Sequence, residues 1–561
     1  MKKLPKTDVV IVGLGAAGGI AASVLTKAGL RVVGLEAGPY LTSKDFMKQL
    51  DEVSGFGMRN RLGEPKYNHE IPTWRTDADS KAVPSPIALR MANAVGGTTL
   101  QYAAMTWRLR ADDFKIRSTT VKRYGEAAIS SDVALVDWPI SYDDLEPYYS
   151  QVEHSIGVSG AAGANPFESQ RSRDYPMPPI MQPGYSKMLE IGMKDLGYHP
   201  FPPPAAINSV SYGGRPACTY CGFCSGFACW NDSKSSTLVT SIREAEKSGK
   251  LEVRPLCTVT RVLTNDKGQA TGVEYRTADG ELVEQPAGVV ILSSYVYENV
   301  RRLLLSKSDI FPNGLSNNHG QVGKYFMTHT FVLLNALFPG NTVNTWGGAL
   351  AQSTAIDDLN GDNFDHTGLG FIRGALVSGF NGTLPIQAAN ALPPGVPTWG
   401  QGYKDWLREN AGSVGNIVAQ LETLPYHGNF LDLDPEFKDP KGESVVRITY
   451  NIHDNEKKAG EFLIGKLTEI LKKMGATQTW FWLPPIPLPV STHAFGGARM
   501  GDDPATSVVD KYCLSHEVPN LVVLGGATFC SASGYNPTGT IQALSWRAAE
   551  HIAQNFNKIA V

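Results

Sequence analysis

The sequence lacks both a long apolar segment and an excess of one charge. Its 561 residues include 51 Lys and Arg against 54 Asp and Glu, which gives a formal net charge of −3. Because there is no basic surplus to neutralise phosphates, nucleic acid is not expected as a partner. No uninterrupted apolar run approaches the roughly 20 residues that cross a bilayer as a helix. The composition therefore argues against a nucleic-acid-binding protein and against an integral membrane subunit.

Charged residues are also few, at 19%, whereas hydrophobic residues make up 42%. The 57 Gly and 36 Pro indicate many turns rather than disorder, since aliphatic and aromatic residues stay abundant. A chain of this length exceeds a single ordinary core, so we expect two structural domains that share one large interior.

The N-terminus has two interpretations. Basic residues within positions 1–6 precede an apolar run at 11–25, which is typical of a signal peptide. That run, however, contains the glycine turn described next, and cleavage would destroy it. We therefore expect the chain to carry no export signal of its own.

Residues 8–12 (DVVIV) predict a buried strand, 16–28 a helix and 31–35 a second strand. Gly13, Gly15 and Gly18 lie at the strand-to-helix turn, where they allow the turn, close approach of a pyrophosphate and helix packing. Glu36 follows the second strand, where a carboxylate can bind both ribose hydroxyls. NAD would also satisfy this pattern, but the run LEAGP at 35–39 favours the flavoprotein version. The pattern thus predicts a Rossmann-like α/β fold that binds FAD.

Three more segments contain small residues and candidate catalytic side chains. They are 94–108 (AVGGTTLQYAAMTWR), 491–501 (STHAFGGARMG) and 534–541 (GYNPTGTI). Removing a hydride from an alcohol carbon requires that the hydroxyl proton leave as well, and a neutral histidine suits that task near neutral pH. With the dinucleotide fingerprint, these segments resemble the glucose-methanol-choline (GMC) oxidoreductases. Within that family the chain is most similar to bacterial FAD and iron–sulfur dehydrogenases of gluconate, fructose, glucose and glucosides.

The resemblance covers most of the chain, including 137–149 (DWPISYDDLEPYY), and weakens between about 330 and 480. It implies the GMC fold, an FAD-binding domain with a substrate domain built on an antiparallel sheet plus helices. The expected FAD-binding domain is discontinuous, at 1–50, 85–114, 215–328 and 491–561. The substrate domain, cap and connectors are expected at 51–84, 115–214 and 329–490, with a cysteine loop at 215–232 and an insertion of unassigned role near 115–134.

The resemblance also assigns roles. His493 matches the catalytic base, and Asn536 matches the second residue, which holds the same hydroxyl oxygen. The residues matched to cofactor binding, beside the fingerprint, are Gly96, Gly97, Thr98, Val259, Ala527, Pro537 and Thr538. Some relatives attach FAD through a histidine at the position of Gln101, which cannot form that bond, so non-covalent FAD is expected.

Cysteine is scarce, and four of its seven residues are clustered as Cys218, Cys221, Cys224 and Cys229. Thiolates at this spacing suit an iron–sulfur cluster or tetrahedral zinc, and disulfides are a third interpretation. The resemblance implies a 3Fe-4S or 4Fe-4S cluster that relays electrons to an external acceptor.

The overall expectation is a dehydrogenase that oxidises a hydroxyl of a sugar, glycoside or sugar acid to a carbonyl. The alternatives are a flavin oxidase with structural cysteines and a lyase that keeps FAD as scaffold. The resemblance further implies a small subunit that bears the export signal and a cytochrome c acceptor. A periplasmic, membrane-associated location follows from these partners, with a cytoplasmic enzyme as the alternative.

Overall fold

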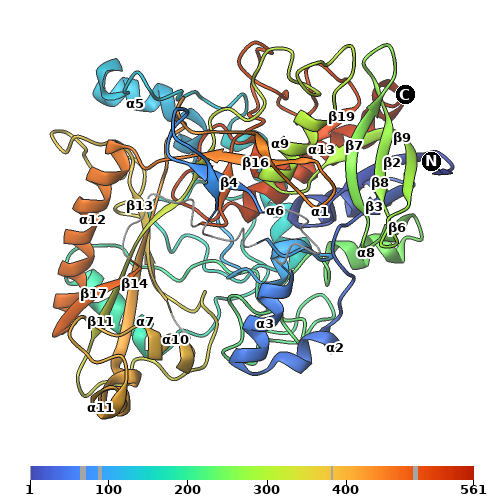
Figure 1. Cartoon of the computed structure of the whole chain (residues 1–561). Coiled ribbons are helices and arrows are strands. Elements are labelled where there is room, and N and C mark those ends of the chain that lie inside the picture. The colour runs from blue at the N-terminus through green and yellow to red at the C-terminus, as the bar shows by residue number, and fades with distance from the viewer. Residues whose placement is uncertain (1, 63–70, 86–90, 381–382, 484–490) are drawn as a thin grey trace.

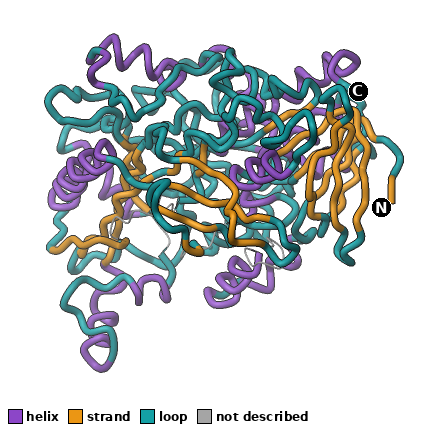
Figure 2. The backbone as a smooth tube through the Cα atoms, turned by 45° about the horizontal axis from the view of Figure 1, so that its top comes forward, coloured by secondary structure: helices purple, strands orange, loops and turns teal. Residues whose placement is uncertain are grey.

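The computed structural model describes residues 2–62, 71–85, 91–380, 383–483 and 491–561. Its elements form two regions, one on each side of Figure 1. Loops account for much of the backbone between them (Figure 2), as the glycine and proline content predicts. Both chain ends lie beside the same sheet in Figure 1.

The first region is built on an eight-stranded mixed sheet. Its main strands, in spatial order, are β6 (Leu251–Arg254), β3 (Val32–Leu35), β2 (Thr7–Val12), β9 (Leu282–Leu292), β8 (Ala270–Arg276) and β7 (Thr258–Thr264), and both β19 (Leu521–Val523) and β1 (Lys2–Lys3) pair with β9. β6, β3, β2, β9 and β19 run parallel, whereas β8 and β7 continue the sheet in antiparallel pairing. The nucleotide-type sheet thus gathers strands from the start, middle and end of the chain, which confirms the predicted α/β class.

The β-rich segment 251–264 forms two strands and not one. β6 ends at Arg254, and β7 begins at Thr258. Pro255 cannot donate to a strand ladder, and Leu256 has a φ of +56°, in the left-handed region. These two residues turn the chain out of the parallel ladder and into the antiparallel one.

The central strands of this sheet have no face in contact with water, because helices and other segments cover the sheet. Val9, Val10 and Ile11 of β2 are completely buried, as expected for a parallel strand inside an α/β layer. α1 (Ala16–Lys27) contacts β2 and β3, α8 (Ser241–Lys247) contacts β6, and α9 (Val296–Leu305) contacts β7. The further helices of this region are α6 (Tyr142–Ile156) and α13 (Thr538–Ile559). α13 packs against α1 and α6, which places the C-terminal helix beside the glycine turn.

The second region contains a five-stranded antiparallel sheet, as predicted for the substrate domain. Its strands, in spatial order, are β12 (Ala355–Ile356), β13 (Ala375–Phe380), β14 (Val414–Leu421), β11 (Thr330–Leu337) and β17 (Gln478–Leu483). α12 (Asp454–Lys473) packs on β11 and β14, and α7 (Gly184–Lys194) packs on α12. The amphipathic pattern of α12 buries Leu463, Leu467 and Ile470 against this sheet.

Smaller elements join the two regions. A four-stranded sheet contains β15 (Phe430–Lys438), β16 (Ser444–Thr449), β4 (Thr73–Arg75) and β5 (Val83–Pro84), and a two-stranded ladder pairs β10 (Met327–Thr328) with β18 (Ala494–Phe495). The remaining α-helices are α2 (Ser43–Phe46), α3 (Glu52–Leu62), α5 (Ile116–Tyr124), α10 (Pro385–Asn390) and α11 (Gly400–Asn410). The strand pairing shows which strands share a sheet, but it does not divide the chain into domains. The domain boundaries therefore stay a prediction. Every helix among the described residues is too short or too polar to span a bilayer.

Candidate active site

The glycine turn after β2 forms one wall of a cavity. Gly13 has a φ of +90°, and a Cβ added to it would lie 2.8 Å from the carbonyl oxygen of Ser293. A Cβ on Gly18 would lie 2.0 Å from the carbonyl oxygen of Gly13, because α1 packs directly on the turn. Gly15 faces the cavity instead, and the nearest atom to its added Cβ is the Cα of Gly97 at 3.9 Å. The N-terminus of α1 is therefore open to a phosphate group.

Glu36 lies at the end of β3 and lines the same cavity. Its Oε2 accepts a hydrogen bond from the amide of Leu14 at 3.0 Å, and its Oε1 accepts one from the amide of Gly38 at 3.0 Å. Burial raises the pKa of Glu36 to about 7, although these donors act in the opposite direction. The two backbone bonds hold the carboxyl group at the edge of the sheet, where a ribose would lie.

Most residues predicted to bind the cofactor line this one cavity. They are Gly13, Gly15, Glu36, Gly97, Thr98, Val259, Pro537 and Thr538. Gly18, Gly96 and Ala527 lie behind the lining, and beside Ala527 the wall itself is made by Gly525 and Gly526. Small residues, backbone amides and one carboxyl group fit the shape and chemistry of a dinucleotide such as FAD.

The structure brings Asn536 against His493, which also lines this cavity. Nδ2 of Asn536 lies 3.2 Å from Nε2 of His493. Oδ1 of Asn536 accepts a hydrogen bond from Nε1 of Trp107 at 2.8 Å. Trp107 is buried and stacks on Tyr535 with ring centroids 5.4 Å apart. No sequence motif points to Trp107, whose indole N–H holds the amide of Asn536.

The other ring nitrogen of His493 contacts a second histidine that sequence reasoning missed. Nδ1 of His493 lies 2.9 Å from Nδ1 of His329, and Nε2 of His329 lies 2.8 Å from the carbonyl oxygen of Ser533. The pairing register explains the contact. Thr328 of β10 faces Ala494 of β18, so the next pair outward is His329 and His493.

Burial keeps both imidazoles neutral. It lowers the pKa of His493 to about 4, and it holds the pKa of His329 well below the usual range with a further contribution from His493. His493 is half-buried and lines both cavities of the site. A neutral imidazole that reaches a cavity meets the requirement for a general base at neutral pH.

A second cavity opens on the other side of His493. The two cavities share Thr98, Tyr102, Thr492, His493 and Thr538. Strands of the five-stranded sheet contribute Phe331, Ser378, Phe380, Val418 and Gln420 to the second one. Gln101 also lines this second cavity. Its amide side chain cannot form the covalent bond to FAD, and non-covalent binding of FAD stays a prediction. Among the described residues, no Asp, Glu, Lys or Arg lines this second cavity.

The four clustered cysteines lie around one small cavity. Cys218, Cys224 and Cys229 are half-buried, Cys221 is exposed, and none of the four forms a disulfide. The cavity they line has a volume of about 20 Å³, room for roughly one water molecule. Within the part of the chain that the structure describes, no three Cys, His, Asp or Glu side chains are grouped closely enough to hold a metal ion. The donors suit a soft metal by type and by location, but this loop is not folded as a closed metal site.

A buried lysine lies beside these thiols. Nζ of Lys234 donates to the carbonyl oxygens of Cys224 at 2.7 Å, Phe227 at 2.8 Å and Tyr102 at 3.1 Å. Burial raises the pKa of the Cys224 thiol to about 11, and the Lys234 charge acts to lower it. Because a buried ammonium that donates to neutral carbonyl oxygens favours an anion nearby, Lys234 supports a negatively charged group among the cysteines. Through Tyr102 it also connects the cysteine loop to both active-site cavities.

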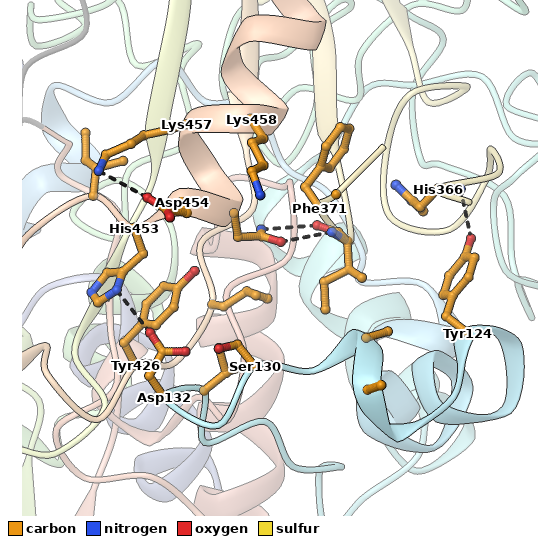
Figure 3. Close-up of a pocket in the computed structure, with 18 of the residues that line it drawn as sticks. Tyr124, Ser130, Asp132, His366, Phe371, Tyr426, His453, Asp454, Lys457 and Lys458 are labelled. Atoms are coloured by element: carbon orange, nitrogen blue, oxygen red, sulfur yellow. Dashed lines mark hydrogen bonds and ion pairs between the residues drawn. The ribbon is translucent and has the colours of Figure 1, made fainter. Parts of the chain in front are cut away.

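The expected insertion at 115–134 contributes no residue to the lining of the two active-site cavities or of the cysteine cavity. It forms α5 and joins Tyr426 in a small hydrophobic cluster. Between it and the first turn of α12 lies a cavity of about 970 Å³ (Figure 3). There His453 stacks on Tyr426 with ring centroids 3.6 Å apart, and its Nδ1 lies 3.3 Å from Asp132 (Figure 3). No predicted site residue lines this cavity, so we do not assign the reaction to it.

The fold and the two joined cavities define a flavin-dependent oxidoreductase, and comparison with known proteins identifies its family. Residues 193–331 and 425–545 match the GMC oxidoreductase family. The chain is 34% identical to the gluconate 2-dehydrogenase flavoprotein of Pantoea cypripedii, over 99% of this chain and 95% of the relative. The protein therefore belongs to the GMC oxidoreductases and is an enzyme of that class, with FAD as the supported cofactor.

Two more comparisons extend this result. The chain is 29% identical to the fructose dehydrogenase large subunit of Gluconobacter japonicus, over 98% of each chain. The structure of formate oxidase from Aspergillus oryzae RIB40 matches with a TM-score of 0.64 at 15% identity, covering 100% of this chain and 99% of that one. The second match shows the fold alone, and it agrees with the predicted GMC fold.

Proposed function

We propose that this enzyme is an FAD-dependent dehydrogenase that oxidises a hydroxyl of a sugar, glycoside or sugar acid to a carbonyl. One observation carries the proposal. His493 lines both the cavity suited to FAD and a second cavity that has room for a substrate, and Asn536, 3.2 Å from it, lines the second.

The chain's own residues account for the proton and the orientation of the alcohol. Nε2 of His493 takes the hydroxyl proton, and Nδ2 of Asn536 donates a hydrogen bond to the same oxygen, which becomes the carbonyl oxygen. When bound, FAD supplies a ring that accepts the hydride from the carbinol carbon. Both alcohol hydrogens are then accounted for, one as a proton on His493 and one as the hydride.

The substrate class follows from the lining and from the relatives. Two relatives are named for gluconate and fructose, one charged and one neutral. The described lining of the second cavity carries Gln101, Ser378 and Gln420 as hydrogen-bonding groups and no cation for a carboxylate. Since an unpaired buried carboxylate is costly, we expect a neutral sugar, polyol or glycoside to be preferred.

Anaerobic mixing of the purified enzyme with sugars tests this assignment. Fructose or another uncharged sugar should bleach the flavin absorbance at least about tenfold faster than gluconate at equal concentration, because the acid loses hydration without gaining a counter-ion. Faster bleaching by gluconate would reject the neutral-substrate class. A flavin that none of the sugars reduces would favour a lyase in which FAD is scaffold.

The proposal includes an iron–sulfur cluster held by Cys218, Cys221, Cys224 and Cys229 as the relay to an external acceptor. Their spacing in the sequence and the buried charge of Lys234 support it. Such a relay suits a flavin, since the flavin takes two electrons at once while clusters pass them singly.

We further propose a periplasmic, membrane-associated complex with a small subunit that bears the export signal and a cytochrome c acceptor. The relative named as a large subunit supports a partner chain. Fractionation of cells that express the untagged protein checks this proposal. The enzyme should copurify with a small subunit from the periplasmic fraction, and recovery as a lone chain from the cytoplasm would favour a soluble enzyme.

A further inference from the structure

His493, His329, Asn536 and their neighbours form one chain of hydrogen bonds whose two ends have fixed polarity. One end is the carbonyl oxygen of Ser533, which can only accept, at 2.8 Å from Nε2 of His329. The other end is the indole nitrogen of Trp107, which can only donate, at 2.8 Å from Oδ1 of Asn536. These ends determine where every proton between them lies.

The two fixed ends determine which nitrogen of each imidazole carries the hydrogen. Nε2 of His329 must carry a hydrogen to bond to the Ser533 carbonyl, and a neutral imidazole has only one such hydrogen. Nδ1 of His329 is therefore an acceptor, so Nδ1 of His493 at 2.9 Å must be the donor. From the Trp107 end, Oδ1 of Asn536 accepts, which turns its NH₂ group toward Nε2 of His493 at 3.2 Å. Both assignments leave the lone pair of His493 on Nε2.

We propose that His329 is a positioning residue that selects the Nδ1–H tautomer of His493 and thereby directs the basic Nε2 lone pair into the active site. His329 is 1% exposed and packs on Phe495 with ring centroids 5.0 Å apart. Water is thereby kept from replacing its acceptor nitrogen. Ser533, whose backbone has a φ of +56°, presents its carbonyl to the far side of the ring.

The same chain of hydrogen bonds determines the route by which the proton leaves His493. After His493 receives a proton on Nε2, its Nδ1–H still bonds to His329, whose own hydrogen points at a carbonyl that cannot take it. The chain of hydrogen bonds therefore ends inside the protein. The proton leaves His493 through the cavity from which it came, and not through the interior.

This inference rests on the proposed role of His493 as the base, yet it is measurable without turnover. The holoenzyme labelled with ¹⁵N in its eleven histidines should show one neutral ring with hydrogen on Nδ1 that disappears in His493→Ala. An Nε2–H tautomer for His493 in the wild-type enzyme would overturn the inference, whatever the effect of His493→Ala on the reaction. A correct tautomer with undiminished flavin reduction in His493→Ala would instead reject the base assignment alone.

Two variants separate positioning from mere packing. His329→Leu removes the acceptor, and it should give mixed tautomers and flavin reduction about tenfold slower, the scale of one lost hydrogen bond. His329→Asn keeps an oxygen where Nδ1 lay, and it should recover the Nδ1–H signal and most of the rate. Equal losses in both variants, or no change in either, would overturn the positioning role. If neither variant retains FAD, the tautomer of the wild-type enzyme still decides the question.

Discussion

Replacing His493 by Ala is expected to slow substrate-dependent flavin reduction by a factor of about 100 or more, the usual contribution of a positioned base. Stopped-flow mixing without oxygen measures the rate of this single step directly. FAD should remain bound, because the residues expected to bind it include the glycine turn and Glu36. Glu36 is held by the amides of Leu14 and Gly38 and not by His493. Reduction at the wild-type rate would reject the assignment of the base.

A second histidine provides a matched control for this variant. His453 is also half-buried and held by an aromatic stack, but it lines the separate cavity near α12. His453→Ala should therefore leave the rate within about twofold of wild type, since changes away from the site have small effects. A loss as large as that in His493→Ala would mean that the assay reports general damage to the fold.

The acid side of the pH profile provides a further check on His493. Burial lowers its pKa from 6.5 to about 4, so the neutral base is present throughout the neutral range. The rate of flavin reduction should hold as the pH falls toward 5 and decline as the pH passes through about 4, where the base becomes protonated. A decline centred near 6.5 would mean that the ring is well hydrated in the working enzyme.

The sequence predicts those parts of the site whose conformation depends on residues close together in the chain. The turn from β2 through Gly13 and Gly15 into α1 is local, and the steric needs of each glycine follow from its place in that turn. His493 and Asn536 are predicted because each lies in a short motif that resembles the GMC oxidoreductases. Their contact, across 43 positions, then emerged in the fold.

The supporting residues could not be predicted in that way. His329 faces His493 only because β10 and β18 pair in one register, and that pairing joins segments more than 160 positions apart. Trp107 and Lys234 likewise act on groups that are distant in sequence, Asn536 in one case and Tyr102 in the other. A single histidine, tryptophan or lysine carries no local signal of such a role, because its partner is fixed by tertiary packing and not by spacing.

Replacing Cys224 by Ser is expected to abolish electron delivery to the external acceptor while flavin reduction by substrate continues. A serine hydroxyl is a poor ligand for soft iron–sulfur chemistry, so the variant should lose iron and acid-labile sulfide together. Flavin reduction should persist, because His493 and Asn536 belong to the other cavity system. The measurements are metal and sulfide content after purification without oxygen, flavin bleaching by sugar, and reduction of added cytochrome c.

Cys513→Ser is the matched control for this last variant, since Cys513 is a buried free thiol outside the cysteine loop. It should keep iron, sulfide and cytochrome reduction near wild-type levels. The native protein should contain little zinc, because a zinc site would bind the same thiols and carry no electrons. If the native protein lacks iron, or if Cys224→Ser retains full transfer to cytochrome c, the relay is wrong. Rapid reoxidation of the reduced flavin by oxygen in that same protein would then establish the oxidase alternative, with the four cysteines as structural thiols.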